Sequence, residues 1–290
     1  MEPTGLIVLD KPAGLTSHDV VARVRRIAGT RRVGHGGTLD PMATGVLILG
    51  AGRATRLLTY VIGSGKAYSA TVRLGQRTIT DDAEGEVVAA VPAGHVTGEQ
   101  IRAGLARLTG EIAQVPSSVS AIKINGRRSY ARVRAGEEVA LAPRQVTVSR
   151  LDLLAVRRTP DLVDLDVDVA CSSGTYIRAL ARDLGADLGV GGHLTALRRT
   201  AVGGFTLAEA VSLEALPDRA MMSLSEAAVR LLPRRDASPE EARVLAHGGP
   251  LPARGIDGPY AVFDPAGEVI AVVLERDGRA RAEVVLAPAA

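Results

Sequence analysis

The 290-residue sequence predicts a fold that mixes α-helices with β-strands and ends in a small β domain. Apolar and polar residues alternate over Lys66–Gly75 and Asp161–Gly174, which is the period of half-buried strands. Capping boxes at Thr16 and Thr97 open two segments whose apolar residues recur at helical spacing. Residues 260–286 hold three apolar runs separated by Pro-Ala-Gly and Asp-Gly turns, and these runs predict a group of strands.

The size and composition allow one large domain with a small one, or two medium domains. Hydrophobic residues make up 46% of the chain, which is ample for a core. We expect a first domain over 1–210, with a distinct basic segment at about 114–148, a helical linker over 211–235 and the β domain over 236–290. Apolar stretches such as Val46–Leu49 are too short to cross a bilayer, and the N-terminus lacks the features of a signal peptide.

The charge and the cysteine count narrow the function classes. Basic residues outnumber acidic ones, 35 against 32, and most are arginines, whose planar guanidinium suits phosphate and base recognition. Arginines cluster at 23–32 and 127–134, although codon bias in a GC-rich genome would also enrich arginine. Cys171 is the only cysteine, which excludes an intrachain disulfide and fits a reducing cytoplasm. The five histidines show no metal-ligand spacing, so we expect no metal.

The first part of the chain alternates short strands and helices. Gly5–Asp10 is a β-type apolar run, and a turn follows it. The helix opened by Thr16 and Asp19 ends at Gly29. Residues 54–63 read as a short helix, and the strand after it places Tyr68 on its apolar face. On this pattern alone Tyr68 is a core residue.

The middle of the chain carries two segments with more than one interpretation. The acidic residues of Asp81–Gly85 resemble a metal loop but lack the further oxygen ligands of a calcium site, so we expect an acidic turn. A helix follows from Thr97 to Gly110. Gln114–Val139 then contains a strand, an Asn-Gly hairpin turn and a basic helix-like stretch. Its arginines would serve RNA binding or only solubility.

The strand over Asp161–Gly174 places its three acids on its outward face, so it predicts no carboxylate cluster. The next helix, over 175–189, has Arg178 in its first turn, where a cation opposes the helix dipole and therefore calls for a reason. Ser238 and Pro239 start a later helix that Gly248 ends.

The string VGHGGTLDPMATGVLILG, Val33–Gly50, is the most distinctive in the chain. Its glycines allow unusual backbone angles and close approach, and Pro41 fixes the chain after Asp40. Such a segment can hold one carboxylate rigidly beside an open space. Asp followed by Pro is also an ordinary helix start or turn, with the aspartate as the cap, so both interpretations of Asp40 stay open here.

These strings resemble the motifs of TruB-type pseudouridine synthases, which convert one uridine in the T-loop of tRNA. The resemblance spans about residues 5–205 and is carried by four strings: GLIVLDKPAGLTSHDVV, the Val33–Gly50 string, GTYIRAL and HLTALRRTAVG. It implies a mixed, mainly antiparallel α+β catalytic domain followed by a small PUA-like β domain. It also implies a stand-alone bacterial tRNA pseudouridine-55 synthase that acts in the cytoplasm as a monomer, without cofactor or metal.

The resemblance also implies roles for individual residues. Asp40 would be the catalytic nucleophile, and Arg178 would pair with its carboxylate and keep it ionised. Tyr68 would stack on the target base and is a candidate for the final proton abstraction. Tyr176 and Leu197 would line the uridine pocket, His35 would contact RNA, and the segment 114–148 would be a thumb that clamps the tRNA loop.

Two other functions remain open at the level of sequence. A non-catalytic RNA-binding or tRNA-folding module would use the basic clusters, with Asp40 as a cap. A hydrolase would use Asp40 as an acid, although no second catalytic carboxylate lies nearby in the sequence. We find no P-loop, dinucleotide fingerprint or Gly-x-Ser-x-Gly elbow, so no nucleotide cofactor is expected.

Overall fold

The computed structural model describes residues 3–117, 123–124, 127–128 and 141–287. The expected combination of helices with mainly antiparallel sheets is confirmed. By packing, the chain divides into two units. The terminal unit comprises Met1–Pro41, Gly45–Ser64 and Ala201–Ala290, and the central unit comprises Met42–Thr44 and Gly65–Thr200. The domain boundaries expected at 210 and 236 stay predictions.

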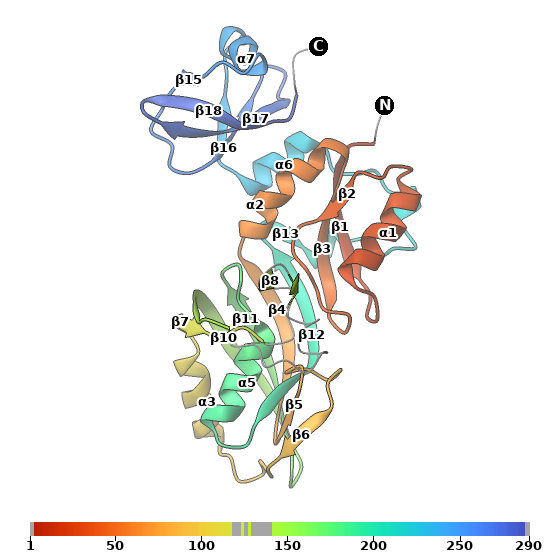
Figure 1. The fold of residues 1–290 in the computed structure, drawn as a ribbon, viewed down its shortest axis with the longest axis vertical. Helices are drawn as coiled ribbons and strands as arrows, with labels where there is room; N and C mark the ends of the chain where they lie inside the picture. Colours follow the sequence, from red (N-terminus) through yellow and green to blue (C-terminus); the bar gives the residue numbers. More distant parts are fainter. Residues whose placement is uncertain (1–2, 118–122, 125–126, 129–140, 288–290) are drawn as a thin grey trace. The chain divides into compact units, whose positions relative to one another are not determined.

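The N-terminal part of the terminal unit is a small antiparallel sheet with helices packed on it (Figure 1). The central strand of this part pairs with both others: Leu6 lies opposite Gly50, and His35 lies opposite Leu49. The elements are β1 (Gly5–Lys11), α1 (Ser17–Ile27), β2 (Val33–His35), β3 (Thr44–Ala51), the 3₁₀ turn η1 (Gly52–Leu57) and α2 (Leu58–Gly63). The expected strand at Gly5–Asp10 and the short helix at 54–63 are confirmed.

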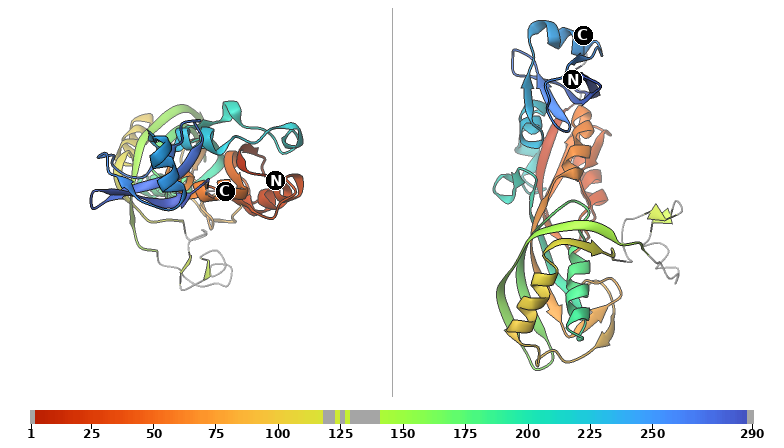
Figure 2. Two further views of the ribbon diagram at one scale, coloured as in Figure 1. Left: turned by 90° about the horizontal axis from the view of Figure 1, so that it is seen from above. Right: turned by 90° about the vertical axis from the view of Figure 1, so that its left-hand side faces the viewer.

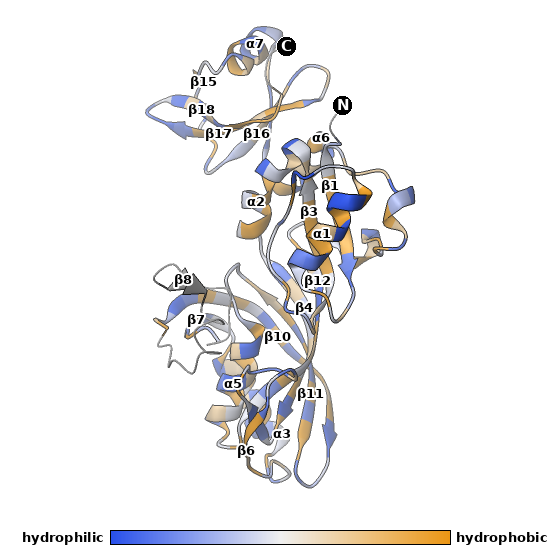
Figure 3. Cartoon of the chain, turned by 45° about the vertical axis from the view of Figure 1, so that its right-hand side comes forward, coloured by the Kyte–Doolittle hydropathy of each residue, from blue (hydrophilic) through white to orange (hydrophobic). Residues whose placement is uncertain are grey.

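Helix α1 begins with the capping box that the sequence predicts. The Thr16 hydroxyl accepts a hydrogen bond from the Asp19 amide at 3.1 Å, and the Asp19 carboxylate accepts one from the Thr16 amide at 2.9 Å. Val20 and Val24 are buried, whereas the hydrophilic face of α1 stands out in Figure 3. Gly29, at φ +62°, ends the helix in a conformation that favours glycine.

The C-terminal part of the terminal unit is a five-stranded sheet in the order β14-β16-β17-β18-β15. The three predicted strands, the Ser238-capped helix and the tight turn at Asp277-Gly278 are all present, and both turn residues have positive φ. Its elements are β13 (Phe205–Thr206), η2 (Leu207–Glu209), η3 (Leu216–Asp218), α6 (Leu224–Leu231), β14 (Arg234–Asp236), α7 (Pro239–Ala246), β15 (Leu251–Pro252), β16 (Tyr260–Phe263), β17 (Val269–Arg276) and β18 (Arg279–Val285).

One buried cluster joins the two parts of the terminal unit. It contains Leu6 and Ile48 from the first sheet together with Phe263 and Leu286 from the second. Helices α2 and α6 contribute to the same cluster, and Figure 1 shows them close together. The Arg53 guanidinium also donates to the Leu286 carbonyl at 3.0 Å.

The central unit is built on the strand order β12-β4-β11-β10-β7, and the pairs β4–β11, β11–β10 and β10–β7 are antiparallel. The two strands β5 and β6 form a separate ribbon. The elements are β4 (Lys66–Leu74), β5 (Gln76–Thr78), β6 (Val87–Ala90), α3 (Gly98–Arg107), β7 (Gly110–Gln114), β8 (Lys123–Ile124), β9 (Arg127–Arg128), β10 (Arg144–Arg158), β11 (Val163–Cys171), α5 (Ile177–Asp187) and β12 (Gly192–Val202).

Strand β11 has the two faces that its sequence predicts. Its apolar residues Leu165, Val167 and Val169 are buried. Its acids point outward and pair with arginines of the neighbouring strands: Arg73 with Asp164 at 2.7 Å, Arg150 with Asp168 at 2.7 Å, and Arg157 with Asp166. The expectation of a half-buried strand with its acids on the outward face is therefore confirmed.

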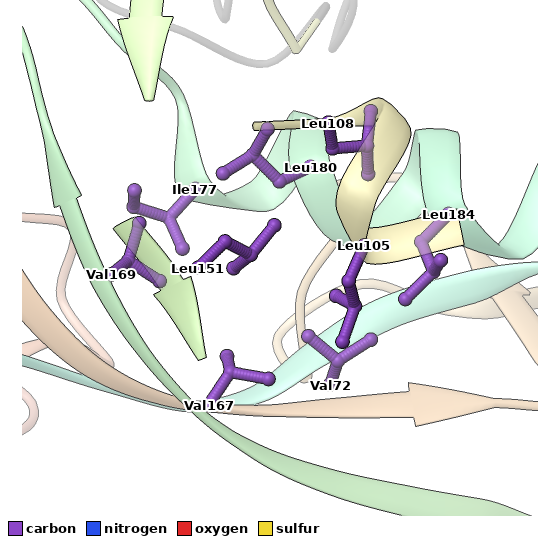
Figure 4. A pocket seen from close by; sticks show the side chains of 9 residues that line it. All are labelled: Val72, Leu105, Leu108, Leu151, Val167, Val169, Ile177, Leu180 and Leu184. Atoms are coloured by element: carbon purple, nitrogen blue, oxygen red, sulfur yellow. The ribbon is translucent and has the colours of Figure 1, made fainter. Parts of the chain in front are cut away.

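Helices α3 and α5 lie side by side against one face of this sheet (Figure 2). Their apolar side chains point toward the sheet around a small apolar cavity lined by Val72, Leu105, Leu108, Leu151, Val167, Val169, Ile177, Leu180 and Leu184 (Figure 4). Glycine at 104 allows this close approach, because a Cβ there would lie 2.6 Å from Leu184 Cδ1 and would require the Leu184 side chain to shift. This packing fixes the axis of α5, whose first turn carries Arg178.

The basic segment expected at 114–148 is described only in part. β8 and β9 pair with each other, Lys123 opposite Arg128, which confirms the hairpin on either side of the predicted Asn-Gly turn. Residues 118–122, 125–126 and 129–140 lie outside the described residues. Within the described part of the chain, no helix is long and apolar enough to cross a membrane.

Candidate active site

Asp40 lies in the loop that joins β2 to β3, and it is half-buried. Pro41 and Met42 form a bend, and the next element is a strand that begins at Thr44. Because no helix starts at Asp40, the interpretation of this residue as a helix cap is wrong. The Asp40 carboxylate therefore lies in a loop and does not cap a helix.

Both neighbours of Asp40 are anchored to the segment around the start of α1. The buried Ser17 hydroxyl accepts a hydrogen bond from the Leu39 amide at 2.9 Å and donates to the Leu39 carbonyl at 3.2 Å. The Pro41 carbonyl accepts from the Lys11 ammonium at 3.2 Å and from the Gly14 amide at 2.8 Å. The backbone on each side of Asp40 is thus fixed, which restricts where its carboxylate can stand.

The glycines before Asp40 let the loop pack closely on α2. The Gly36 amide donates to the Ile48 carbonyl at 2.8 Å, and a Cβ at Gly36 would lie 2.4 Å from Val61 Cγ1. Gly37 has φ +109°, a backbone conformation that side chains disfavour. The glycine-rich string is therefore a packing requirement of this loop.

His35, at the end of β2, contacts a second histidine that the sequence did not single out. Its ring lies 5.4 Å from the His18 ring, edge to face, with 78° between the planes. His18 is exposed on α1. The contact orients the His35 ring in the string that leads to Asp40.

The other four predicted site residues belong to the central unit. Tyr68 on β4 is 7% exposed and Leu197 on β12 is 9% exposed, and these two strands are neighbours. The prediction that Tyr68 lies on the buried face is confirmed. Tyr176 is the half-buried residue that precedes α5, and Arg178 in the first turn is buried.

Arg178 is held by the segment that we expected to be a plain acidic turn. Its guanidinium donates to the Thr80 carbonyl at 2.7 Å and lies 3.4 Å from the Asp82 carboxylate, which is itself 2% exposed. Asp81, which precedes Asp82 and has φ +60°, has its carboxylate 3.5 Å from the Arg182 guanidinium. Burial raises the pKa of Asp81, against the opposing effect of the two arginines.

The sequence contained a signal for this arrangement. Arg178 and Arg182 are spaced i, i+4 and therefore share one face of α5, and two adjacent acids occupy the turn. Asp40 and Arg178 belong to different units, so the ion pair expected between their side chains stays a prediction. Within the central unit, the Thr44 hydroxyl accepts a hydrogen bond from the Arg198 guanidinium at 3.2 Å. Thr44 follows Asp40 closely in the chain, and Arg198 is the residue after Leu197.

Three further residues of the site region were missed by the sequence analysis. Lys11 and Ser17 anchor the Asp40 loop, and Gln114 binds the backbone of Tyr176. Only the tertiary structure brings them to these positions. In the described residues, no group of three or more His, Cys, Asp or Glu side chains is placed to hold a metal ion.

Sequence models of known families match nearly the whole chain. The model described as TruB family pseudouridylate synthase (N terminal domain) matches residues 25–177. Residues 178–234 match a tRNA pseudouridylate synthase B C-terminal domain, and residues 232–287 match the model described as tRNA Pseudouridine synthase II, C terminal.

Curated proteins and solved structures agree with these matches. A tRNA pseudouridine synthase B from Arthrobacter sp. (strain FB24) is 56% identical over 98% of this chain and 97% of its own. One from Mycobacterium bovis is 57% identical over 98% of this chain and 96% of its own. A crystal structure of a Cbf5-Nop10-Gar1 complex superposes with TM-score 0.76 at 27% identity, over 98% of this chain and 85% of that chain.

Proposed function

The chain belongs to the TruB family of pseudouridylate synthases, and we propose that it converts the uridine at position 55 in the T-loop of tRNA to pseudouridine, with Asp40 as nucleophile. It is an isomerase, as its relatives' name states, and that name supports tRNA as the substrate. The observation that carries the role of Asp40 is the double anchoring of its loop, through Ser17 to Leu39 and through Lys11 to Pro41.

The reaction begins when the uridine leaves the folded loop, because a stacked base is out of reach of a side chain. Extrusion costs roughly a few kcal/mol. We propose that His35 and the adjacent glycines occupy the space that the nucleotide leaves. The contact of His35 with His18 supports this role, since it places the imidazole beside the exposed start of α1.

Asp40 then attacks the flipped nucleotide, and the N-glycosidic bond breaks. The proposal covers attack on either the base or the sugar carbon. The detached uracil turns and bonds to the sugar through a ring carbon, while its former glycosidic nitrogen gains a proton. The carbon loses its proton to Tyr68 or to a water. Atoms and charge balance within the substrate, so the reaction needs no cofactor.

The remaining predicted site residues would bind the uracil or act on the Asp40 carboxylate. We propose that Tyr68, Tyr176 and Leu197 contact the uracil, and that Arg178 pairs with Asp40 and keeps it ionised. The burial of Arg178 supports this role, because a nearby cation stabilises a carboxylate most where water is excluded. We propose that the enzyme acts as a monomer in the cytoplasm, with the segment 114–148 as the thumb that clamps tRNA.

The test is a single incubation of the purified protein with an unmodified tRNA transcript and no cofactor, followed by chemical mapping of pseudouridine. We expect one new pseudouridine at position 55, and none with Asp40→Asn, which keeps the shape of the side chain but removes the nucleophile. The binding affinity of Asp40→Asn for the same transcript should stay close to that of the wild type. Turnover by Asp40→Asn would refute the mechanism, and tight binding without any product would favour the RNA-binding module.

A further inference from the structure

Gln114, the last residue of β7, binds the backbone of Tyr176 through both ends of its side-chain amide. Its Oε1 accepts a hydrogen bond from the Tyr176 amide at 2.8 Å, and its Nε2 donates to the Tyr176 carbonyl at 3.1 Å. Gln114 is only 2% exposed. Because the backbone amide can only donate and the carbonyl can only accept, this pair of bonds fixes the orientation of the Gln114 amide.

The Tyr176 carbonyl is held by α5, since it accepts from the Ala179 amide at 3.1 Å and the Leu180 amide at 3.2 Å, but the Tyr176 amide donates to Gln114. Tyr176 is the N-cap residue of α5, in the extended conformation with φ −101° and ψ 107°, and its side chain forms no capping hydrogen bond. An N-cap residue usually carries a short polar side chain that accepts a hydrogen bond from an amide in the first turn of the helix. Gln114 instead satisfies the amide of the N-cap residue itself, which in a capping box is the role of the N3 side chain.

The sheet fixes the position of Gln114. Gln114 lies opposite Arg144 in the ladder between β7 and β10, so its backbone is fixed independently of α5. The next residue makes a second tie, since the Val115 carbonyl accepts from the Arg182 guanidinium at 2.7 Å. The end of β7 therefore holds the first half of α5 at two points.

We propose that Gln114 is a positioning residue for the isomerisation, which acts by fixing Tyr176 against the uracil. The inference rests on the proposed function, in which Tyr176 contacts the uracil. Removal of the side-chain amide leaves the Tyr176 amide without this acceptor and loosens the backbone at the point where the chain turns into α5. A displacement of about 1 Å at such a position can reduce a rate by about 100-fold.

The first variant is Gln114→Met, which has a similar volume and neither hydrogen bond. We expect kcat to fall by about 10- to 100-fold, with KM for tRNA within about twofold of the wild type, because phosphate contacts dominate tRNA affinity. The matched control is Gln100→Met. The Gln100 side chain accepts from the Thr97 amide at 2.8 Å at the start of α3, so its loss weakens a helix start away from Tyr176. It should lower the Tm and leave kcat unchanged.

A second variant tests the donor of the pair. Gln114→Glu keeps an acceptor for the Tyr176 amide, but an ionised carboxylate cannot donate to the Tyr176 carbonyl and repels it. Protonation restores the donor. The ratio of kcat in Gln114→Glu to kcat in the wild type should therefore rise as the pH is lowered, a response that a purely structural role would not produce.

A double-mutant cycle tests whether Gln114 acts through the Tyr176 side chain. In a Tyr176→Leu background, Gln114→Met should reduce kcat by less than about threefold, because residues that act as a unit are not additive. Equal losses in both backgrounds, or a folded Gln114→Met with wild-type kcat, would overturn the inference. If Gln114→Met does not fold, the pH response of Gln114→Glu decides, and a flat ratio refutes the inference. A wild-type protein that forms no pseudouridine would instead refute the proposed function.

Discussion

The ammonium group of Lys11 lies 3.2 Å from the carbonyl oxygen of Pro41, 30 residues further along the chain. Lys11 is completely buried, and it also donates to the carbonyls of Pro12 at 2.9 Å and Leu15 at 2.6 Å. A buried cation is tolerated only when such dipoles replace its hydration. The charge of Lys11 is thus solvated by the turn after β1 together with the residue that follows Asp40.

We expect Lys11→Met to weaken both the fold and the active-site loop. The variant keeps the apolar stem but leaves the carbonyls of Pro12, Leu15 and Pro41 without this donor, which we expect to destabilise the protein by about 1–3 kcal/mol. Because the Asp40 loop loses one anchor, kcat for pseudouridine formation should also fall. Urea unfolding and turnover at a temperature where the variant is folded are the measurements. Ser17→Ala, which removes the other anchor, should lower kcat in the same way, and wild-type kcat in both variants would contradict the role of the anchors.

Gly36→Ala should be destabilising because its new side chain would crowd Val61. The new Cβ would lie 2.4 Å from Val61 Cγ1 and 2.8 Å from Val61 Cβ, and such overpacking costs roughly 1–3 kcal/mol. Val61→Ala in the same chain removes the nearer of these two contacts. We therefore expect the double variant to be more stable than the sum of the two single losses predicts, as measured by urea unfolding. Strict additivity would show that the loop does not pack on α2 in this way.

Arg178→Met should be among the most destabilising single changes in the central unit. It leaves Asp82, which is 2% exposed, without its guanidinium partner, and breaking a buried pair in this way costs about 3–5 kcal/mol. Adding Asp82→Asn removes the unpaired charge, so unfolding experiments should show part of the stability restored. The double variant should stay inactive, because Arg178 is also proposed to serve Asp40.

Arg182→Met is the matched control for that change. The Arg182 side chain is 23% exposed, lies 3.5 Å from Asp81 and donates to the Val115 carbonyl at 2.7 Å, so its loss should cost about 1–3 kcal/mol, less than the loss of the more deeply buried Arg178. A cost as large as that of Arg178→Met would mean that the two pairs form one network.

The sequence was most informative where structure depends on near neighbours. The boxes at Thr16 and Thr97, the alternation of β11 and the turn at Asp277-Gly278 all depend on residues a few positions apart, and all were predicted. The family motifs located Asp40 and the other proposed site residues. Their roles in catalysis remain proposals that the experiments above address.

The sequence was least informative about which side chain meets which across the fold. An acidic turn such as Asp81-Asp82 is exposed in most proteins, and it is buried here only because α5 brings two arginines to it. Gln114 lies 62 positions from Tyr176, so no local pattern connects them. A lysine is rarely buried, and the carbonyls that solvate Lys11 converge only in the folded chain.

Lys66 provides a prediction about pH. Burial, together with the charge of Arg199, lowers the pKa of Lys66 from 10.5 to about 8. Between these two values the unfolded chain holds a proton that the folded chain has released, so this group makes stability rise with pH across that window. Below pH 8 both states are protonated, and the buried charge destabilises the fold by about 1–2 kcal/mol, after a reduction for partial exposure.

Lys66→Met removes this charge, and its stability relative to the wild type should therefore be greatest at pH 7 and decline steadily toward pH 10.5. Lys66→Arg, which stays charged throughout, should show the opposite trend, with a deficit that grows as the wild-type lysine becomes neutral. Urea unfolding of the three proteins at pH 7, 8, 9 and 10 measures both differences. Burial raises the pKa of Cys171 and the charge of Lys66, its partner in the strand ladder, opposes that rise, so all three proteins are compared in a Cys171→Ala background. Parallel stability curves for all three proteins would show that Lys66 keeps its ordinary pKa in the folded chain.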